Sequence, residues 1–189
     1  MPNNSLSQRG FSLIETAMAL GVLSIGLMGA AAVLTTGLNL VQTSPFDLIA
    51  TQKAAEAVES VFSGRDSHVL TWAQIRNVLG SSGTDGGVFI DGPQPLKLVG
   101  PDGLVNTADD AAQPVESMVY PGQDQKMFTA DDVTVTLSGY TREIQIRDVP
   151  GEVDVNGICN LRSITVTVIY QAGQTSRRYS LVTYISTYS

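Results

Sequence analysis

Hydrophobic residues follow two patterns: one long apolar run near the amino terminus, and alternating apolar and polar positions in the carboxyl-terminal half. From residue 17 to residue 34 every position is apolar or glycine except Ser24. A helix of about 20 residues is long enough to cross the roughly 30 Å hydrocarbon core of a bilayer. The run therefore predicts a membrane-entering helix within residues 11–45.

The pattern is interrupted at Ser44-Pro45. Proline removes a backbone donor and disfavours helix at the preceding residue, so we expect a kink or short break there. Helical periodicity then resumes, and Gly64 is a plausible stop. The expected apolar stripe of this segment consists of Phe46, Ile49, Ala50, Ala54, Ala57, Val58 and Val61.

A short second helix is expected over residues 71–79. Thr71 would be its N-cap, Gln74 stands in the capping-box position, and Gly80 would end it. The side chains expected to face inward are Trp72, Ile75 and Leu79.

Four later stretches alternate and are rich in Thr, Val, Ile and Tyr, which is typical of half-buried strands. They are residues 133–137, 140–149, 161–170 and 177–186. The last two are joined by QAGQTS, a hairpin-length loop that contains a glycine. The pattern alone predicts an α+β fold with an antiparallel sheet of about four strands.

Charge and composition exclude several functional classes. The 189-residue chain has a formal net charge of −7, which argues against nucleic acid as a partner, because phosphate binding needs a basic surface. A single cysteine excludes an intrachain disulfide and a cysteine-based zinc site. No nucleophile–base pair or phosphate-binding loop is recognisable, so we expect no enzyme.

Glu15 is the one ionisable side chain between Phe11 and Phe46. A carboxylate within an apolar span is costly and usually indicates a functional partner, which a simple anchor helix leaves unexplained. A secretory signal peptide would have a shorter apolar region and small residues at a cleavage site. Here the run is long and continues without such a site.

The sequence GFSLIE, residues 10–15, followed by about twenty apolar residues, resembles the signal of type IV prepilins and type II secretion pseudopilins. By this resemblance Gly10 precedes the cut made by prepilin peptidase, and Phe11 becomes the N-methylated amino terminus. Glu15 matches the glutamate of the family's assembly helix. The resemblance also implies a long amino-terminal helix, with a transmembrane half and an amphipathic half, packed on the sheet.

Glu15 then has a physical role in assembly. In a filament it can meet the amino cation that cleavage creates on Phe11 of a neighbouring subunit, and this pairing would help to set axial register. Small residues would let neighbouring helices approach closely. These residues are Gly21, Ser24, Gly26, Gly29, Ala30, Ala31 and Ala32.

Two acidic segments repeat between the helices and the strands. GPDGLVNTADD, residues 100–110, aligns with GQDQKMFTADD, residues 122–132. Carboxylates on glycine-containing loops suit calcium, which takes six to eight oxygen ligands at flexible angles. The segments resemble calcium-binding loops of some pseudopilins and other exported bacterial proteins, although Gln125 replaces the glycine found at Gly103. The candidate ligands are Asp102, Asp109, Asp110, Asp124, Asp131 and Asp132; solvated acidic turns without metal are the alternative.

These resemblances predict three parts: a leader (1–10), a transmembrane and assembly helix (11–45), and an exported head (46–189) with an acidic loop insert (85–132). SIGLMG, residues 24–29, is similar to PilV-type minor pilins, so a minor type IV pilin is the expected function. The alternatives are a type II secretion pseudopilin and, from another class, a membrane-anchored calcium-dependent adhesin or hydrolase.

The implied partners are other pilins or pseudopilins, prepilin peptidase, the inner-membrane assembly platform and, before assembly, the membrane itself. The expected location is the bacterial inner membrane with a cytoplasmic amino terminus, and later a pilus, the periplasm or the cell surface. Charge bias agrees with this orientation, because Arg9 precedes the span whereas Asp47, Glu56 and Glu59 outweigh Lys53 after it.

Overall fold

The computed structural model describes residues 12–79, 86–173 and 175–188, and the side chains of residues 39–44 are not described. The chain divides into two compact units, Met1–Ser44 and Pro45–Ser189, each described here by itself. The predicted cleavage residues Gly10 and Phe11, and the predicted helix stop Gly80, lie outside the described residues.

The main helix, α1, spans Leu13–Asp66 and contains Pro45. The alternative of a short break at Ser44-Pro45 is therefore wrong, because the backbone stays helical through the proline, which removes only one helix hydrogen bond. A kink there stays a prediction. The helix also continues two residues beyond Gly64. Gly64 serves close packing instead, because a Cβ there would lie 2.9 Å from side-chain carbons of Leu70 and Leu104.

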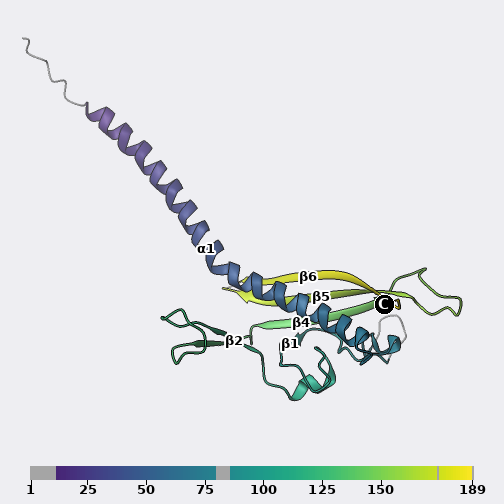
Figure 1. The fold of residues 1–189 in the computed structure, drawn as a ribbon. Helices are drawn as coiled ribbons and strands as arrows, with labels where there is room; N and C mark the ends of the chain where they lie inside the picture. Colours follow the sequence, from purple (N-terminus) through teal and green to yellow (C-terminus); the bar gives the residue numbers. More distant parts are fainter. Residues whose placement is uncertain (1–11, 80–85, 174, 189) are drawn as a thin grey trace, which may run out of the picture. The chain divides into compact units, whose positions relative to one another are not determined.

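The second unit contains a four-stranded antiparallel sheet in the order β1-β4-β5-β6 (Figure 1). The strands are β1 (Gln94–Pro95), β4 (Tyr140–Asp148), β5 (Leu161–Ala172) and β6 (Thr175–Ser186). Residues alternate between buried and half-exposed along β4 and β5, as the period-two pattern predicted. An α+β fold with a long helix and a four-stranded antiparallel sheet is confirmed.

One predicted strand belongs elsewhere. Residues 133–137 were expected in the main sheet, but β3 (Val133–Thr136) pairs with β2 (Ser117–Tyr120) in a separate two-stranded sheet. The fourth strand of the main sheet is the short β1. We call residues 117–136 the β2–β3 arm; side chains on both of its strands are largely exposed.

The core lies between the sheet and the part of α1 that follows Pro45 (Figure 1). Ala50, Ala54 and Ala57 are buried at helical spacing, and their small side chains let the helix backbone approach the sheet closely. The buried side chains of β4 and β5 are aliphatic or aromatic except for Arg142 and Arg162. The apolar ones include Ile144, Ile164, Val166 and Val168.

The predicted helix over residues 71–79 is wrong beyond its first turn. Thr71 caps a single 3-10 turn, η1 (Trp72–Gln74), and its backbone N–H donates to Gln74 Oε1 at 2.9 Å, so the capping box is confirmed. Leu79, expected to face inward, is 71% exposed, whereas Ile75 is buried. The chain leaves the helical path because other groups take its carbonyls: Arg162 Nη1 donates to those of Trp72 and Ile75.

Candidate functional site

The apolar part of α1, Leu13–Leu38, is long and hydrophobic enough to cross a membrane, with a mean hydropathy of 2.2, and it is not buried against the rest of the described chain. Its hydroxyls are satisfied within the helix. Ser24 donates to the Leu20 carbonyl at 2.8 Å, and Thr35 donates to that of Ala31 at 2.9 Å. These polar groups therefore need no water, as a helix surrounded by apolar groups requires.

Glu15 lies in the first turn of α1 and is exposed. Among the described residues, no hydrogen-bond donor or cation contacts its carboxylate. Gly21, Gly26 and Gly29 are equally unconstrained, since a Cβ at each would meet no atom within 4 Å in the described chain. The features singled out by the sequence thus occupy an open helix surface, available to a partner outside the chain.

With this geometry in view, the comparison with protein families gives one match. Residues 5–31 match the prokaryotic N-terminal methylation motif. The match supports a type IV pilin or pseudopilin, and hence a structural subunit that interacts with other pilins, with the processing peptidase and with the membrane. No curated protein and no solved structure matches the chain.

The two acidic segments, here called loop 1 (residues 100–110) and loop 2 (residues 122–132), fold in the same way. In loop 1, Asp102 N donates to Asp109 Oδ2 at 3.0 Å, and Thr107 Oγ1 donates to Asp109 Oδ1 at 2.6 Å. In loop 2, Asp131 accepts the matching bonds from Asp124 N at 3.2 Å and from Thr129 Oγ1 at 2.7 Å. The repeat seen in the sequence is therefore a structural repeat.

Backbone conformation repeats as well. Left-handed residues stand at the same two positions of each loop, Gly103 and Asn106 in loop 1, and Gln125 and Phe128 in loop 2. Glycine and asparagine tolerate this region, whereas a bulky residue such as phenylalanine rarely occupies it. Gln125 stands in loop 2 where loop 1 has Gly103, and the turn is the same in both loops. Gln125 N donates to the Gly122 carbonyl and Gly103 N donates to the Gly100 carbonyl, each at 3.1 Å.

The loops differ in their surroundings. Loop 1 is bonded to β4 of the main sheet, where Asn106 Nδ2 donates to the Arg142 carbonyl at 2.8 Å and Arg142 Nε donates to Asn106 Oδ1 at 2.9 Å. Arg142 is only 1% exposed. Loop 2 lies in the β2–β3 arm, and Phe128, the counterpart of Asn106, is 94% exposed.

The loop carboxylates have distinct electrostatics. The Thr107 hydroxyl and the Asp102 N–H lower the pKa of Asp109, and the Thr129 hydroxyl and the Asp124 N–H lower that of Asp131. Burial raises the pKa of Asp110, although Gly100 N donates to it at 2.8 Å. Asp109 and Asp131 are therefore the most acidic of the candidate ligands for which a direction is known.

The carboxylate oxygens of both loops accept hydrogen bonds from their own loop. In the described part of the chain, no group of three or more His, Cys, Asp or Glu side chains is arranged to hold a metal ion. Calcium ligation by the six aspartates therefore stays a prediction. It would rely on loop carbonyls as much as on carboxylates.

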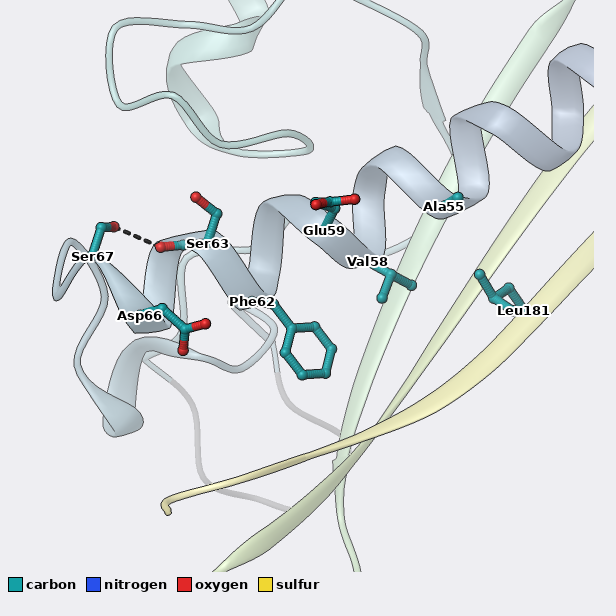
Figure 2. A pocket seen from close by; sticks show the side chains of 8 residues that line it. All are labelled: Ala55, Val58, Glu59, Phe62, Ser63, Asp66, Ser67 and Leu181. Carbon is teal, nitrogen blue, oxygen red and sulfur yellow. Dashed lines mark hydrogen bonds between the residues drawn. The ribbon is translucent and has the colours of Figure 1, made fainter. Parts of the chain in front are cut away.

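A groove between α1 and β6 was not anticipated from the sequence. It has a volume of about 790 Å³; Val58, Phe62 and Leu181 form its apolar side, and Glu59 and Asp66 stand at its rim (Figure 2). β6 is the last strand of the sheet, so one side of the groove is an unpaired strand edge. Unpaired edges are common sites of protein–protein contact.

Proposed function

We propose that the protein is a minor type IV pilin, cut after Gly10 by prepilin peptidase, methylated on Phe11, and then incorporated into a pilus or used to start its assembly. The observation that carries the proposal is the carboxylate of Glu15, which has no partner among the described residues, on an exposed apolar helix whose first turns lie within a prokaryotic N-terminal methylation motif. A helix that stays in lipid gains nothing from that charge, whereas a helix that packs beside others can pair it.

The proposed partner of Glu15 is the amino cation of Phe11 on a neighbouring subunit. Breaking a buried ion pair by removing one partner costs about 3–5 kcal/mol, because the other charge is left uncompensated. Glu15→Ala is therefore expected to leave membrane insertion intact and to lower the amount of protein in the filament. Glu15→Asp is the matched control, because it keeps the charge and loses only one methylene. Equal filament content in wild type and Glu15→Ala would contradict the pairing.

The placement in a pilus rests on the similarity of residues 24–29 to PilV-type minor pilins. A type II secretion pseudopilin is the second candidate, because loops 1 and 2 resemble calcium-binding loops of some pseudopilins. The test is to shear surface fibres from cells and to probe them for the protein. Its absence from the fibres, together with intact pili and blocked secretion in a deletion strain, would favour the pseudopilin.

Processing has its own test. Mass spectrometry of the native protein should show an amino terminus at Phe11 that carries a methyl group, and Gly10→Ala should leave the leader attached. The membrane orientation proposed here, with the amino terminus in the cytoplasm of a bacterial cell, follows from Arg9 before the span and the acidic excess after it. A protease added outside the inner membrane should then remove the second unit of the uncleaved Gly10→Ala protein and leave its leader protected.

A further inference from the structure

A small pocket lies in the second unit where α1 ends, about 30 Å along the helix from Pro45. Its volume is about 310 Å³, which is at the lower end of the roughly 300–1,000 Å³ of small-molecule sites. The residues that line it come from the last turn of α1, the turn that follows and the carboxyl-terminal segment, and include Asp66, His68, Trp72 and Thr187. No residue of loop 1 or loop 2 contributes to this pocket.

Trp72 gives the pocket a fixed aromatic wall. It is half-buried, and its Nε1 donates to the Cys159 carbonyl at 2.7 Å. The Arg162 guanidinium covers one face of the indole, 4.1 Å from the ring centroid. Arg162 is not among the residues that line the pocket, so the part of the indole that does line it is uncovered. An aromatic surface held in this way loses little conformational entropy when a flat apolar ring packs against it.

The polar side chains beside Trp72 offer free hydrogen-bond acceptors. Arg65 Nε donates to Asp66 Oδ1 at 2.7 Å, whereas Asp66 Oδ2 has no partner among the described residues. His68 Nδ1 lies 3.1 Å from the Asp66 carbonyl oxygen. Because a carbonyl only accepts, Nδ1 carries the proton, and Nε2 of the neutral ring is an acceptor. A ligand of this pocket therefore has to supply hydrogen-bond donors.

The backbone at His68 is an independent sign that its side chain has a use. His68 follows the end of α1 with φ 60°, the left-handed conformation in which helices most often end with glycine. The turn caps the helix, because His68 N donates to the Arg65 carbonyl at 3.0 Å and Leu70 N donates to that of Gly64 at 2.9 Å. The imidazole itself is exposed and lines the pocket. Residues held in an unfavourable conformation without a packing reason are typical of ligand sites.

We propose that this pocket binds a neutral pyranose sugar, with one face of the ring against Trp72 and with hydroxyl groups that donate to Asp66 Oδ2 and His68 Nε2. A pyranose has a face of C–H groups and an edge of hydroxyls, so it matches an aromatic wall bordered by acceptors. An anionic ligand finds Arg65 already paired with Asp66, and a cationic ligand is repelled by Arg65 and Arg162. This site goes beyond the proposed function and does not depend on it.

The test is a titration of the full-length protein in a detergent without a sugar headgroup, such as lauryldimethylamine oxide, because alkyl glycosides would compete for the pocket. The methyl glycosides of glucose, galactose, mannose and N-acetylglucosamine are added one at a time, and the emission of Trp72, the single tryptophan, is followed. At least one glycoside should shift the emission and saturate, with a Kd between about 0.1 and about 10 mM, as expected for a small ligand with few contacts. Glycerol is the control ligand, because it has hydroxyls but no ring face.

Two variants locate the site. Asp66→Asn should raise the Kd at least about tenfold, because it weakens a hydrogen bond to a charged acceptor. Glu59→Gln is the matched control, since it removes the same charge from an exposed position of α1 outside this pocket and should leave the Kd unchanged. His68→Gly should weaken binding while the second unit becomes at least as stable, because glycine caps the helix without strain. A folding defect would not produce that combination.

Four results would overturn the sugar site. They are no saturating response to any of the four glycosides, an equal response to glycerol, an equal Kd for Asp66→Asn and wild type, and tighter binding of methyl glucuronide than of methyl glucoside. The last result would show that the pocket selects an anion. Because none of these measurements involves processing or filament content, the proposed function would stand in each case.

Discussion

Replacing the equivalent residues Asn106 and Phe128 by glycine should change stability in opposite directions. Both residues hold a left-handed backbone, with φ of 62° and 67°. Glycine adopts this conformation without strain, so each substitution keeps the loop path and removes only the side chain. The two positions therefore compare one backbone conformation in a buried and in an exposed setting.

The expected magnitudes follow from the contacts. Asn106→Gly removes the bonds to Arg142 Nε and to the Arg142 carbonyl, both buried. Leaving buried groups unsatisfied costs about 1–3 kcal/mol each, so for two groups we expect a loss of about 2–6 kcal/mol. Phe128→Gly removes a left-handed penalty of about 1–2 kcal/mol at a flexibility cost of about 0.5–1 kcal/mol, and no packing is lost. We expect a net gain of about 0.5–1 kcal/mol.

Urea unfolding of the full-length chain in detergent, followed by tryptophan fluorescence, measures both effects. Trp72 is the single tryptophan, and it reports on the second unit because its Nε1 donates to the Cys159 carbonyl at 2.7 Å and the Arg162 guanidinium lies 4.1 Å above its ring. A destabilisation by Asn106→Gly of less than about 1 kcal/mol, or a shift of the same sign for both variants, would refute the reasoning.

Three further predictions concern the second unit. Calcium bound to loops 1 and 2 is expected to stabilise this unit by about 2.7 kcal/mol at a calcium concentration of 100 times the dissociation constant, and so to raise its melting temperature. Asp109→Asn should reduce this rise. A melting temperature that does not change when a chelator is added would show that the loops are acidic turns without metal. Burial raises the pKa of Tyr140 and Tyr170 to about 12. These folded-state values exceed the ordinary value of about 10, so the stabilisation is complete below pH of about 10 and is lost as the pH rises towards about 12. Absorbance at the phenolate band should show two late-titrating tyrosines, and one in Tyr170→Phe. Ala54→Leu should cost about 1–3 kcal/mol through overpacking, whereas Ala55→Leu, on the exposed face, should cost little in the same urea experiment.

The strands of the main sheet were predictable because their residues alternate. Val166 and Val168 are buried while their neighbours are half-exposed, so the period of two indicates both that the segment is a strand and which of its faces is buried. The same alternation places Arg142 in line with the buried Tyr140 and Ile144. A buried cation at Arg142 was therefore predictable from the same alternation.

Contacts far apart in the chain explain what could not be predicted. The helical pattern over residues 71–79 is overridden because the carbonyls of Gln74 and Arg76 accept N–H groups from Val88 and Phe89. The assignment of β3 to a separate sheet depends on its pairing with β2, where Tyr120 lies opposite Val133. Neither partner can be found from local periodicity, since pairing depends on the path of the intervening chain.

The candidate site divides in the same way. Glu15 and the acidic loops were identified from sequence because a charge in an apolar run and a repeated motif are local signals. The groove lined by Val58, Phe62 and Leu181 was missed, because it is formed by a helix and a strand more than a hundred residues apart in the chain. An apolar residue on an amphipathic helix gives no local sign of whether it lies in a core or beside a groove.

Loops 1 and 2 share one backbone conformation but differ in how much substitution the fold tolerates at equivalent positions. Asn106 is held by a buried arginine, so almost any replacement there disturbs the interior. Phe128 occupies the corresponding place in loop 2, where the hydrogen bonds run mainly from backbone N–H groups to aspartate carboxylates. Related chains should accordingly retain loop 1 nearly unchanged and diversify at the tip of loop 2, because a change there leaves the interior of the second unit undisturbed.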